Sequence, residues 1–132
     1  MFGSLGGYFI EQKLKSTCSK FEEDHTFEYR LRESTLIKEK FPDRLPFIVE
    51  RRPGTNYEEI SKNKYLVPTE LTIAKFIYTL RKRLRLTPEQ ALYVYINNQL
   101  PSNSSLIVDI YNEYKNEDGF VYMFYAMENT FG

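Results

Sequence analysis

The residue best placed for chemistry is the glycine at the end of the sequence. An apolar, strand-like run, Phe120–Tyr125, is followed by Ala-Met-Glu-Asn-Thr-Phe131-Gly132. Because glycine has no Cβ, an acyl-adenylate or thioester at its carboxylate meets little crowding inside a narrow enzyme active site. Proteins used as covalent tags need this geometry. One terminal glycine is weak support, however, since about 7% of residues in average proteins are glycine.

Cys18 and His25 are a second candidate for chemistry, as the only cysteine and the only histidine in the chain. A thiol beside an imidazole can act as nucleophile and base, but a single histidine near a helix start is far more often structural. A zinc site needs about four ligands, and these two residues do not suffice. The sequence also lacks a glycine-rich phosphate loop and a Gly-x-Ser-x-Gly elbow. We therefore expect no catalytic residues, no metal and no cofactor.

Length and composition indicate one globular domain with its own core. The 18 Lys and Arg balance the 18 Asp and Glu, so net charge gives no reason to expect nucleic acid as a partner. A single cysteine excludes an internal disulfide and fits a reducing compartment. No apolar stretch approaches the roughly 20 residues of a membrane-spanning helix, and no Lys or Arg precedes Phe2–Ile10 as in a signal peptide. We expect any membrane association to come from the C-terminal end or from a partner.

The spacing of apolar residues, together with the prolines and glycines that end helices and strands, predicts the elements that position these groups. Helical spacing predicts helices over 27–41 and 73–84, and a shorter helix over 106–114 capped by Ser104 or Ser105. Strands are predicted at 45–49, 62–68, 91–96 and 120–125. The continuous apolar run 91–96 predicts a strand buried on both faces. Two strands, a crossover helix and two more strands fit an α+β roll with a helix on one face of a mixed sheet.

The predicted strand Lys62–Pro68 has features typical of a sheet edge, because lysines flank it and a proline ends it. An edge strand can accept an extended peptide as an added strand, with side-chain pockets on both faces. Leu66 is predicted on one face and Tyr65 and Val67 on the other. With 11 Tyr and 10 Phe in the chain, some aromatic rings could line such a groove. The same residues also suit an ordinary buried strand, and the cations at 81–85 suit a solvated helix end.

Several motifs point to a family. They are Lys40-Phe-Pro-Asp-Arg-Leu-Pro46, Lys64-Tyr-Leu-Val-Pro68, Ile96-Asn-Asn98, Glu117-Asp-Gly-Phe-Val-Tyr-Met123 and Phe131-Gly132. In this order and spacing, the chain from about Lys20 to Gly132 resembles the autophagy ubiquitin-like modifiers, the GABARAP-like proteins. The resemblance implies an α+β, ubiquitin-like β-grasp with a four-stranded mixed sheet and two additional N-terminal helices. The chain then divides into an N-terminal appendage (1–16), a ubiquitin-like domain with its N-terminal helices (17–126) and a flexible C-terminal leash (127–132).

The resemblance also implies a non-catalytic function. Activating and conjugating enzymes would join Gly132 to phosphatidylethanolamine, and a cysteine protease would process the precursor and remove the lipid. The protein would be cytoplasmic and, once lipidated, attached to autophagosome or other vesicle membranes as an adaptor. The absence of a tail after Gly132 fits either a mature form or a gene that ends at glycine. The alternative is an unconjugated β-grasp adaptor in vesicle trafficking or microtubule association, which uses the edge strand but not Gly132.

By the same resemblance, the groove has two pockets for an aromatic-x-x-aliphatic motif in receptors and adaptors. The pocket for the aromatic residue (pocket one) matches Glu33, Ile37, Pro46, Ile48, Lys64, Leu66 and Phe120. The pocket for the aliphatic residue (pocket two) matches Tyr65, Val67, Pro68, Leu71, Phe76 and Leu80. Arg44 and Arg83 match basic positions that meet acidic residues around the motif, or the processing protease.

The segment 1–16 matches no part of the family pattern. Phe2-Gly-Ser-Leu5 itself has the aromatic-x-x-aliphatic form, so it could occupy the groove of its own or a neighbouring molecule. Apolar residues between Leu5 and Ile10 could instead rest on a membrane after lipidation. A disordered tail is the simplest explanation of the segment and the one that we favour.

Overall fold

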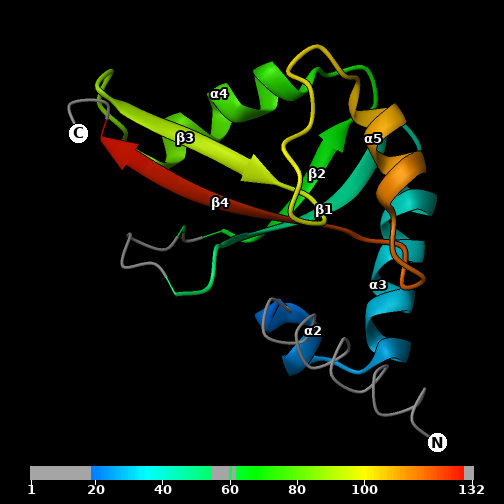
Figure 1. The fold of residues 1–132 in the computed structure, drawn as a ribbon. Coiled ribbons are helices and arrows are strands. Elements are labelled where there is room, and N and C mark those ends of the chain that lie inside the picture. The colour runs from blue at the N-terminus through cyan, green and yellow to red at the C-terminus, as the bar shows by residue number, and fades with distance from the viewer. Residues whose placement is uncertain (1–18, 55–59, 61, 130–132) are drawn as a thin grey trace, which may run out of the picture.

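The computed structural model describes residues 19–54, 60 and 62–129, and the segments outside these ranges are not considered further as structure (Figure 1). The helices are α2 (Lys20–Asp24), α3 (Phe27–Lys40), α4 (Ile73–Leu84) and α5 (Ile107–Tyr114). The strands are β1 (Arg44–Arg51), β2 (Lys64–Pro68), β3 (Gln90–Tyr95) and β4 (Val121–Asn129). The three predicted helices and four predicted strands are confirmed in kind and order. No helix in the described ranges is long and apolar enough to cross a bilayer.

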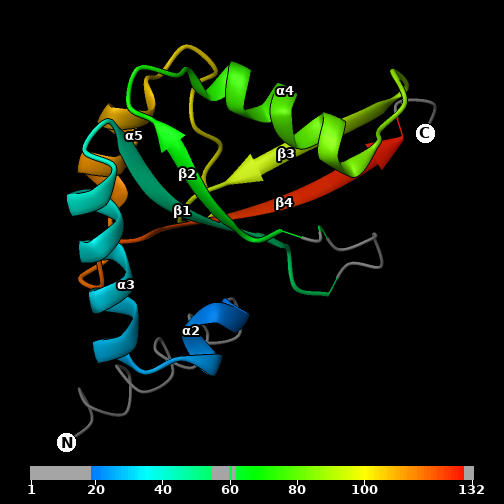
Figure 2. The same ribbon diagram turned by 180° about the vertical axis from the view of Figure 1, so that it is seen from behind.

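The four strands form one mixed sheet in the order β2-β1-β4-β3. β1 runs antiparallel to β2 and parallel to β4, and β3 runs antiparallel to β4. α4 lies across one face of the sheet, while α2 and α3 lie at the other (Figures 1 and 2). The predicted α+β fold, with a four-stranded mixed sheet and two helices before it, is confirmed.

The sheet separates two apolar clusters, because successive strand residues point to opposite faces. Phe47 and Val49 of β1 join the larger cluster, which includes Ile73, Phe76 and Leu80 of α4. Ile48, between them in sequence, joins a smaller cluster on the other face. The members of this smaller cluster are Phe21, Ile48, Phe120 and Tyr122, with Ile37 packed against them.

Two predictions about the strands are wrong. β3 is not buried on both faces: Leu92 and Val94 are buried, but Tyr93 is 37% exposed, because β3 is a sheet edge and only the face toward α4 is fully covered. β4 continues to Asn129, since its last residues pair with β3 as far as Gln90. Residues 127–129, which we expected in the leash, therefore belong to a strand.

The predicted serine cap of α5 is also wrong. The N-cap residue is Leu106, whose side chain makes no capping hydrogen bond. Backbone carbonyls replace it: Ile107 N donates to Leu71 O at 2.8 Å and Val108 N to Thr69 O at 3.1 Å. The first N–H groups of α5 are thus satisfied by the segment that leads into α4, and no side-chain cap is needed.

A buried carboxylate joins α3 to the start of β4. Asp118 is 2% exposed, and its Oδ2 lies 3.1 Å from Arg30 Nε. The Tyr122 hydroxyl donates to the same oxygen, and Phe120 N donates to Oδ1 at 3.0 Å. Burial, together with the hydrogen bond to Asp118, holds the pKa of Tyr122 well above its usual range, so this hydroxyl stays a donor.

The next residue brings the same turn into contact with α3. Gly119 has a φ of +88°, and a Cβ at this position would lie 2.2 Å from Ser34 Oγ. Because this space is free of a Cβ, the Ser34 hydroxyl approaches the turn and donates to the Asp118 carbonyl. Glycine is required here both for the left-handed backbone and for the close approach of the helix.

Replacing Asp118 by alanine should cost about 3–5 kcal/mol of unfolding free energy, because the Arg30 guanidinium loses its ionic partner and the Tyr122 hydroxyl loses its buried acceptor. Urea denaturation followed by far-UV circular dichroism measures the change. Glu117→Ala is the matched control, since Glu117 is exposed, and it should change stability by less than about 0.5 kcal/mol. Equal midpoints for the two variants would show that the carboxylate does not stabilise this junction.

Candidate functional site

β2 is an edge strand, as predicted from its lysines and proline. Val49 N donates to Asn63 O at 2.8 Å. Along an antiparallel strand, residues whose backbone groups bond to the neighbouring strand alternate with residues whose backbone groups point away from it. The backbone N–H and C=O groups of Tyr65 and Val67 therefore point toward β1, whereas those of Lys64 and Leu66 point to the open edge. The Arg44 guanidinium donates to the Leu66 carbonyl at 3.3 Å. Both backbone groups of Lys64 and the N–H of Leu66 are suitably placed for an added strand.

This register also explains how β1 tolerates a proline beside the edge. Pro46 lies opposite Leu66, in a pair whose backbone groups point away from each other. The missing N–H of Pro46 therefore costs no hydrogen bond to β2.

The residues of pocket one come together between β2 and α3. Ile48 and Phe120 are fully buried and form the floor. Ile37 packs against this floor, and Leu66 lies opposite the buried Pro46 in the neighbouring strand. Across the mouth, Lys64 Nζ lies 2.6 Å from Glu33 Oε1, with about 30% of each side chain exposed. The site is an apolar floor behind a half-exposed ion pair.

The residues of pocket two are also neighbours, on the other face of β2, but most of them belong to the main core. Tyr65, Val67, Phe76 and Leu80 are at most 5% exposed. Leu71 is half-buried against this cluster, and Pro68 is exposed. An aliphatic side chain that approaches from solvent therefore meets Leu71 and Pro68 first.

Cations surround the edge strand. The Arg83 guanidinium lies 5.7 Å from the centroid of the Tyr65 ring, and Lys62 Nζ lies 5.1 Å from it. With Arg44 and Lys64, they give this edge a field that favours acidic ligands. Lys62 was not among the predicted site residues, although its position beside the strand was a usable signal.

Tyr65 carries an unusual polar group for a core residue. Its hydroxyl is buried and has no hydrogen-bond partner among the described residues. Burial raises the pKa of this phenol, while the nearby Arg83 lowers it. The neutral hydroxyl is thus an available donor at the border of pocket two.

α2 contributes a residue to pocket one that the sequence analysis did not single out. The Phe21 ring packs edge-on against Phe120 at 5.2 Å, and Lys64 Nζ lies 5.8 Å from its centroid. The carboxylate of Glu50 fixes α2 by accepting from the backbone N–H groups of Lys20 and Phe21, both at 3.1 Å. The signal was present, since Ser19 and Glu22 have the spacing of a capping box around Phe21.

The groove continues onto the outer side of α3. A hollow of about 480 Å³ lies there, and it shares Glu33 and Ile37 with pocket one. Its other lining residues are Leu36, Glu39, Lys40 and Phe41. Leu36 is 52% exposed, so an apolar ligand side chain beyond the aromatic position would find a partner here.

The other sequence candidates are not brought into a catalytic arrangement by the described residues. His25 packs between Phe21 and Tyr29, with ring centroids 4.7 and 4.5 Å away, which fits a structural role. Cys18 and Gly132 lie outside the described ranges. Within those ranges, no group of three or more His, Cys, Asp or Glu residues could hold a metal ion.

Comparison with known proteins agrees with this fold. A family model described as "Autophagy protein Atg8 ubiquitin like" matches residues 29–132. Autophagy-related protein 8A of Oryza sativa subsp. indica is 50% identical over 114 residues, which are 86% of this chain and 96% of the rice protein. Autophagy-related protein 8d of Arabidopsis thaliana is 46% identical over 114 residues, covering 86% of this chain and 95% of its own.

Solved structures show the same likeness. The crystal structure of Trypanosoma brucei ATG8 superposes with a TM-score of 0.81 at 44% identity, covering 87% of this chain and 99% of that one. Plasmodium falciparum Atg8, solved in complex with a Plasmodium falciparum Atg3 peptide, gives a TM-score of 0.76 at 31% identity, covering 83% and 96%. The fold is thus the ubiquitin-like fold implied by the sequence motifs, and the chain belongs to the Atg8 family of autophagy ubiquitin-like proteins.

Proposed function

We propose that this chain is a membrane-attached modifier that binds peptides along β2. Its Gly132 carboxylate forms an amide bond with phosphatidylethanolamine, which places the protein on autophagosome or related vesicle membranes. There it recruits receptors and autophagy factors through their aromatic-x-x-aliphatic motifs. The observation that supports this proposal best is the open edge of β2, which lies between two apolar clusters and is surrounded by cations.

The edge explains how a short peptide is held. Its backbone adds a strand to β2 through the N–H and C=O groups of Lys64 and the N–H of Leu66. The aromatic residue sits in pocket one, over Ile48 and Phe120, and the aliphatic residue sits against Leu71 in pocket two. Because side chains of an added strand alternate between faces, two pockets on opposite faces of β2 select residues an odd number of positions apart, such as the three of this motif.

Acidic residues before the motif suit the rim. Lys62, Lys64, Arg44 and Arg83 attract carboxylates and steer their approach. The Lys64–Glu33 ion pair opens when a peptide carboxylate replaces Glu33, and the new ion pair with Lys64 offsets part of the free energy lost by breaking the old one.

Conjugation needs no catalytic group on this chain. An activating enzyme forms the Gly132 acyl-adenylate from ATP with release of pyrophosphate, and a cysteine thiol then displaces AMP to give a thioester. Transfer to a conjugating enzyme and attack by the lipid amine release the thiol and form the amide. The Atg3 peptide bound by the Plasmodium relative supports a conjugating enzyme as one partner. A cysteine protease that processes the tail and removes the lipid completes the set.

Deleting Gly132 should abolish stable membrane attachment. Two acyl chains contribute about 0.8 kcal/mol per buried CH₂, so an attached phospholipid anchors the protein, whereas no helix in the described part of the chain could span a bilayer. The measurement is flotation of phosphatidylethanolamine vesicles after reaction with the activating and conjugating enzymes and ATP, with mass spectrometry of the C-terminal peptide. Omitting ATP is the control. An unchanged vesicle-bound fraction would instead favour the unconjugated adaptor.

Leu66→Arg should abolish binding of an acidic peptide that carries the motif. The wild type should bind with a Kd near micromolar, about −8 kcal/mol, and an unpaired charge at pocket one should cost several kcal/mol. Calorimetry measures the affinity. Tyr93→Arg is the matched control, because Tyr93 lies on β3 at the opposite edge of the sheet, and it should bind normally.

Lys64→Ala and Arg44→Ala should weaken the same peptide less, and mainly at low salt, since both cations are partly exposed. The groove assignment fails if Leu66→Arg is folded and binds as tightly as the wild type.

A further inference from the structure

Charge is unevenly distributed over this molecule, although its net charge is zero. α4 carries Lys75, Arg81, Lys82 and Arg83 and has no Asp or Glu. α5 shows the opposite pattern, with Asp109 and Glu113 and no Lys or Arg. The protein is therefore positive at α4 and negative at α5, and such a polarity orients it in an electric field.

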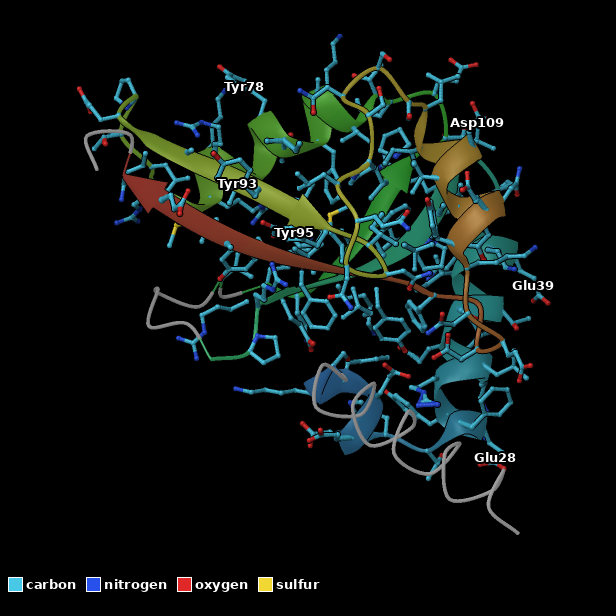
Figure 3. All side chains as sticks on the ribbon, viewed as in Figure 1. Glu28, Glu39, Tyr78, Tyr93, Tyr95 and Asp109 are labelled. Atoms are coloured by element: carbon cyan, nitrogen blue, oxygen red, sulfur yellow. The ribbon has the colours of Figure 1, made fainter. Side chains whose placement is uncertain are left out.

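The outer face of α4 combines cations with an aromatic ring. Ile73, Phe76 and Leu80 bury one side of the helix, so Lys75, Tyr78 and Lys82 share the opposite side by their helical spacing. Tyr78 is 60% exposed and points away from the sheet (Figure 3). Lys82 Nζ lies 4.6 Å from the centroid of its ring. We call these three residues the α4 outer face.

The lysines of the α4 outer face are available for a partner. Within the described part of the chain, neither Lys75 nor Lys82 forms a salt bridge. Arg81 differs, because its guanidinium donates to Gln90 O at 2.7 Å and to Thr87 O at 3.0 Å and so has a structural role. Arg83 lies by Tyr65 and belongs to the groove.

The same arginine shows where α4 lies relative to the C-terminal end. Gln90, which accepts from Arg81, pairs with Asn129, the last residue of β4. The C-terminal ends of α4 and β4 are thus neighbours at one end of the molecule (Figures 1 and 2). Gly132 follows Asn129 by three residues, a reach of about 10 Å.

We infer that the α4 outer face lies on the headgroups of an anionic bilayer when the chain is anchored at Gly132. This inference rests on the proposed lipidation, which holds this end of the molecule at the membrane. Lysines near an anionic leaflet each strengthen binding about fivefold. Tyrosine suits the headgroup region because it has an apolar ring and a polar tip.

The position of pocket one is compatible with this orientation. α4 packs on one face of the sheet, whereas the floor of pocket one, Ile48 and Phe120, lies on the other face. Tyr78 points away from the sheet, and Glu28 of α3 lies at the far end of the molecule from it (Figure 3). A contact at the α4 outer face therefore leaves pocket one open to receptors.

A fluorescence experiment tests the contact without conjugating enzymes. The chain has no Trp, so Tyr78→Trp provides a single reporter. Gly132→Cys, in a Cys18→Ser background, is coupled to a maleimide lipid in phosphatidylcholine vesicles with or without about 25% phosphatidylserine, an anionic lipid. We expect a blue shift of the emission only with phosphatidylserine, and its loss at high salt. Tyr29→Trp on α3 is the control reporter and should not shift.

Charge removal gives a second, quantitative arm. Lys75→Gln with Lys82→Gln should abolish the blue shift and lower binding of the unanchored chain to phosphatidylserine vesicles about 30-fold. Lys38→Gln with Lys40→Gln removes the same charge from α3 and should have little effect. Circular dichroism checks that both variants fold.

The outcomes separate this inference from the proposed function. Equal emission on neutral and anionic vesicles, or an equal shift for Tyr29→Trp, would overturn the membrane contact and leave an acidic protein as the candidate partner of this face. A salt-sensitive shift specific to Tyr78→Trp supports the contact even if the enzymes fail to conjugate Gly132, because the anchor is chemical.

Discussion

The arrangement of the groove depends on one buried carboxylate. Asp118 receives Arg30 from α3 and the Phe120 N–H and Tyr122 hydroxyl from the start of β4. A buried ion stabilises a fold only when it is paired and its remaining lone pairs are satisfied. Here the Arg30 guanidinium pairs with the carboxylate and two groups donate hydrogen bonds to it. This junction sets the distance between α3, which carries Glu33 and Ile37, and the floor residue Phe120. The proposed peptide site therefore depends on a polar contact that is not part of its own lining.

The two faces of the sheet are covered to different extents. On one face, α4 and α5 complete a large core that provides most of the apolar burial. On the other, α2 and α3 cover only a small cluster, in which Phe21 and Ile37 lie over Ile48 and Phe120. Pocket one lies on this second face, where α2 and α3 bury fewer apolar residues. α2 has only five residues and is held by the carboxylate of Glu50, and this smaller cover borders the groove at which we propose that peptides bind.

Local sequence patterns were enough for elements whose surroundings are simple. The spacing of Ile73, Phe76 and Leu80 predicted α4, and Lys and Pro around 62–68 predicted an edge strand. The position of the site residues depended on motif resemblance, because Ile48, Leu66 and Phe120 meet only through long-range pairing. The errors have the same origin. An apolar run cannot show which face of β3 lacks a helix, the end of β4 is stabilised by Gln90 across the sheet, and α5 is capped by carbonyls of residues 69 and 71.

The central position of β4 has a mechanical consequence. A pull applied at its C-terminal end runs along a strand that is hydrogen-bonded to parallel β1 on one side and to antiparallel β3 on the other. Ladder bonds lie across the strand direction, so such a load shears both ladders at once instead of opening them bond by bond. Both ladders therefore oppose tension at the end that would carry a lipid under the proposed function, while β2 is not itself hydrogen-bonded to the loaded strand.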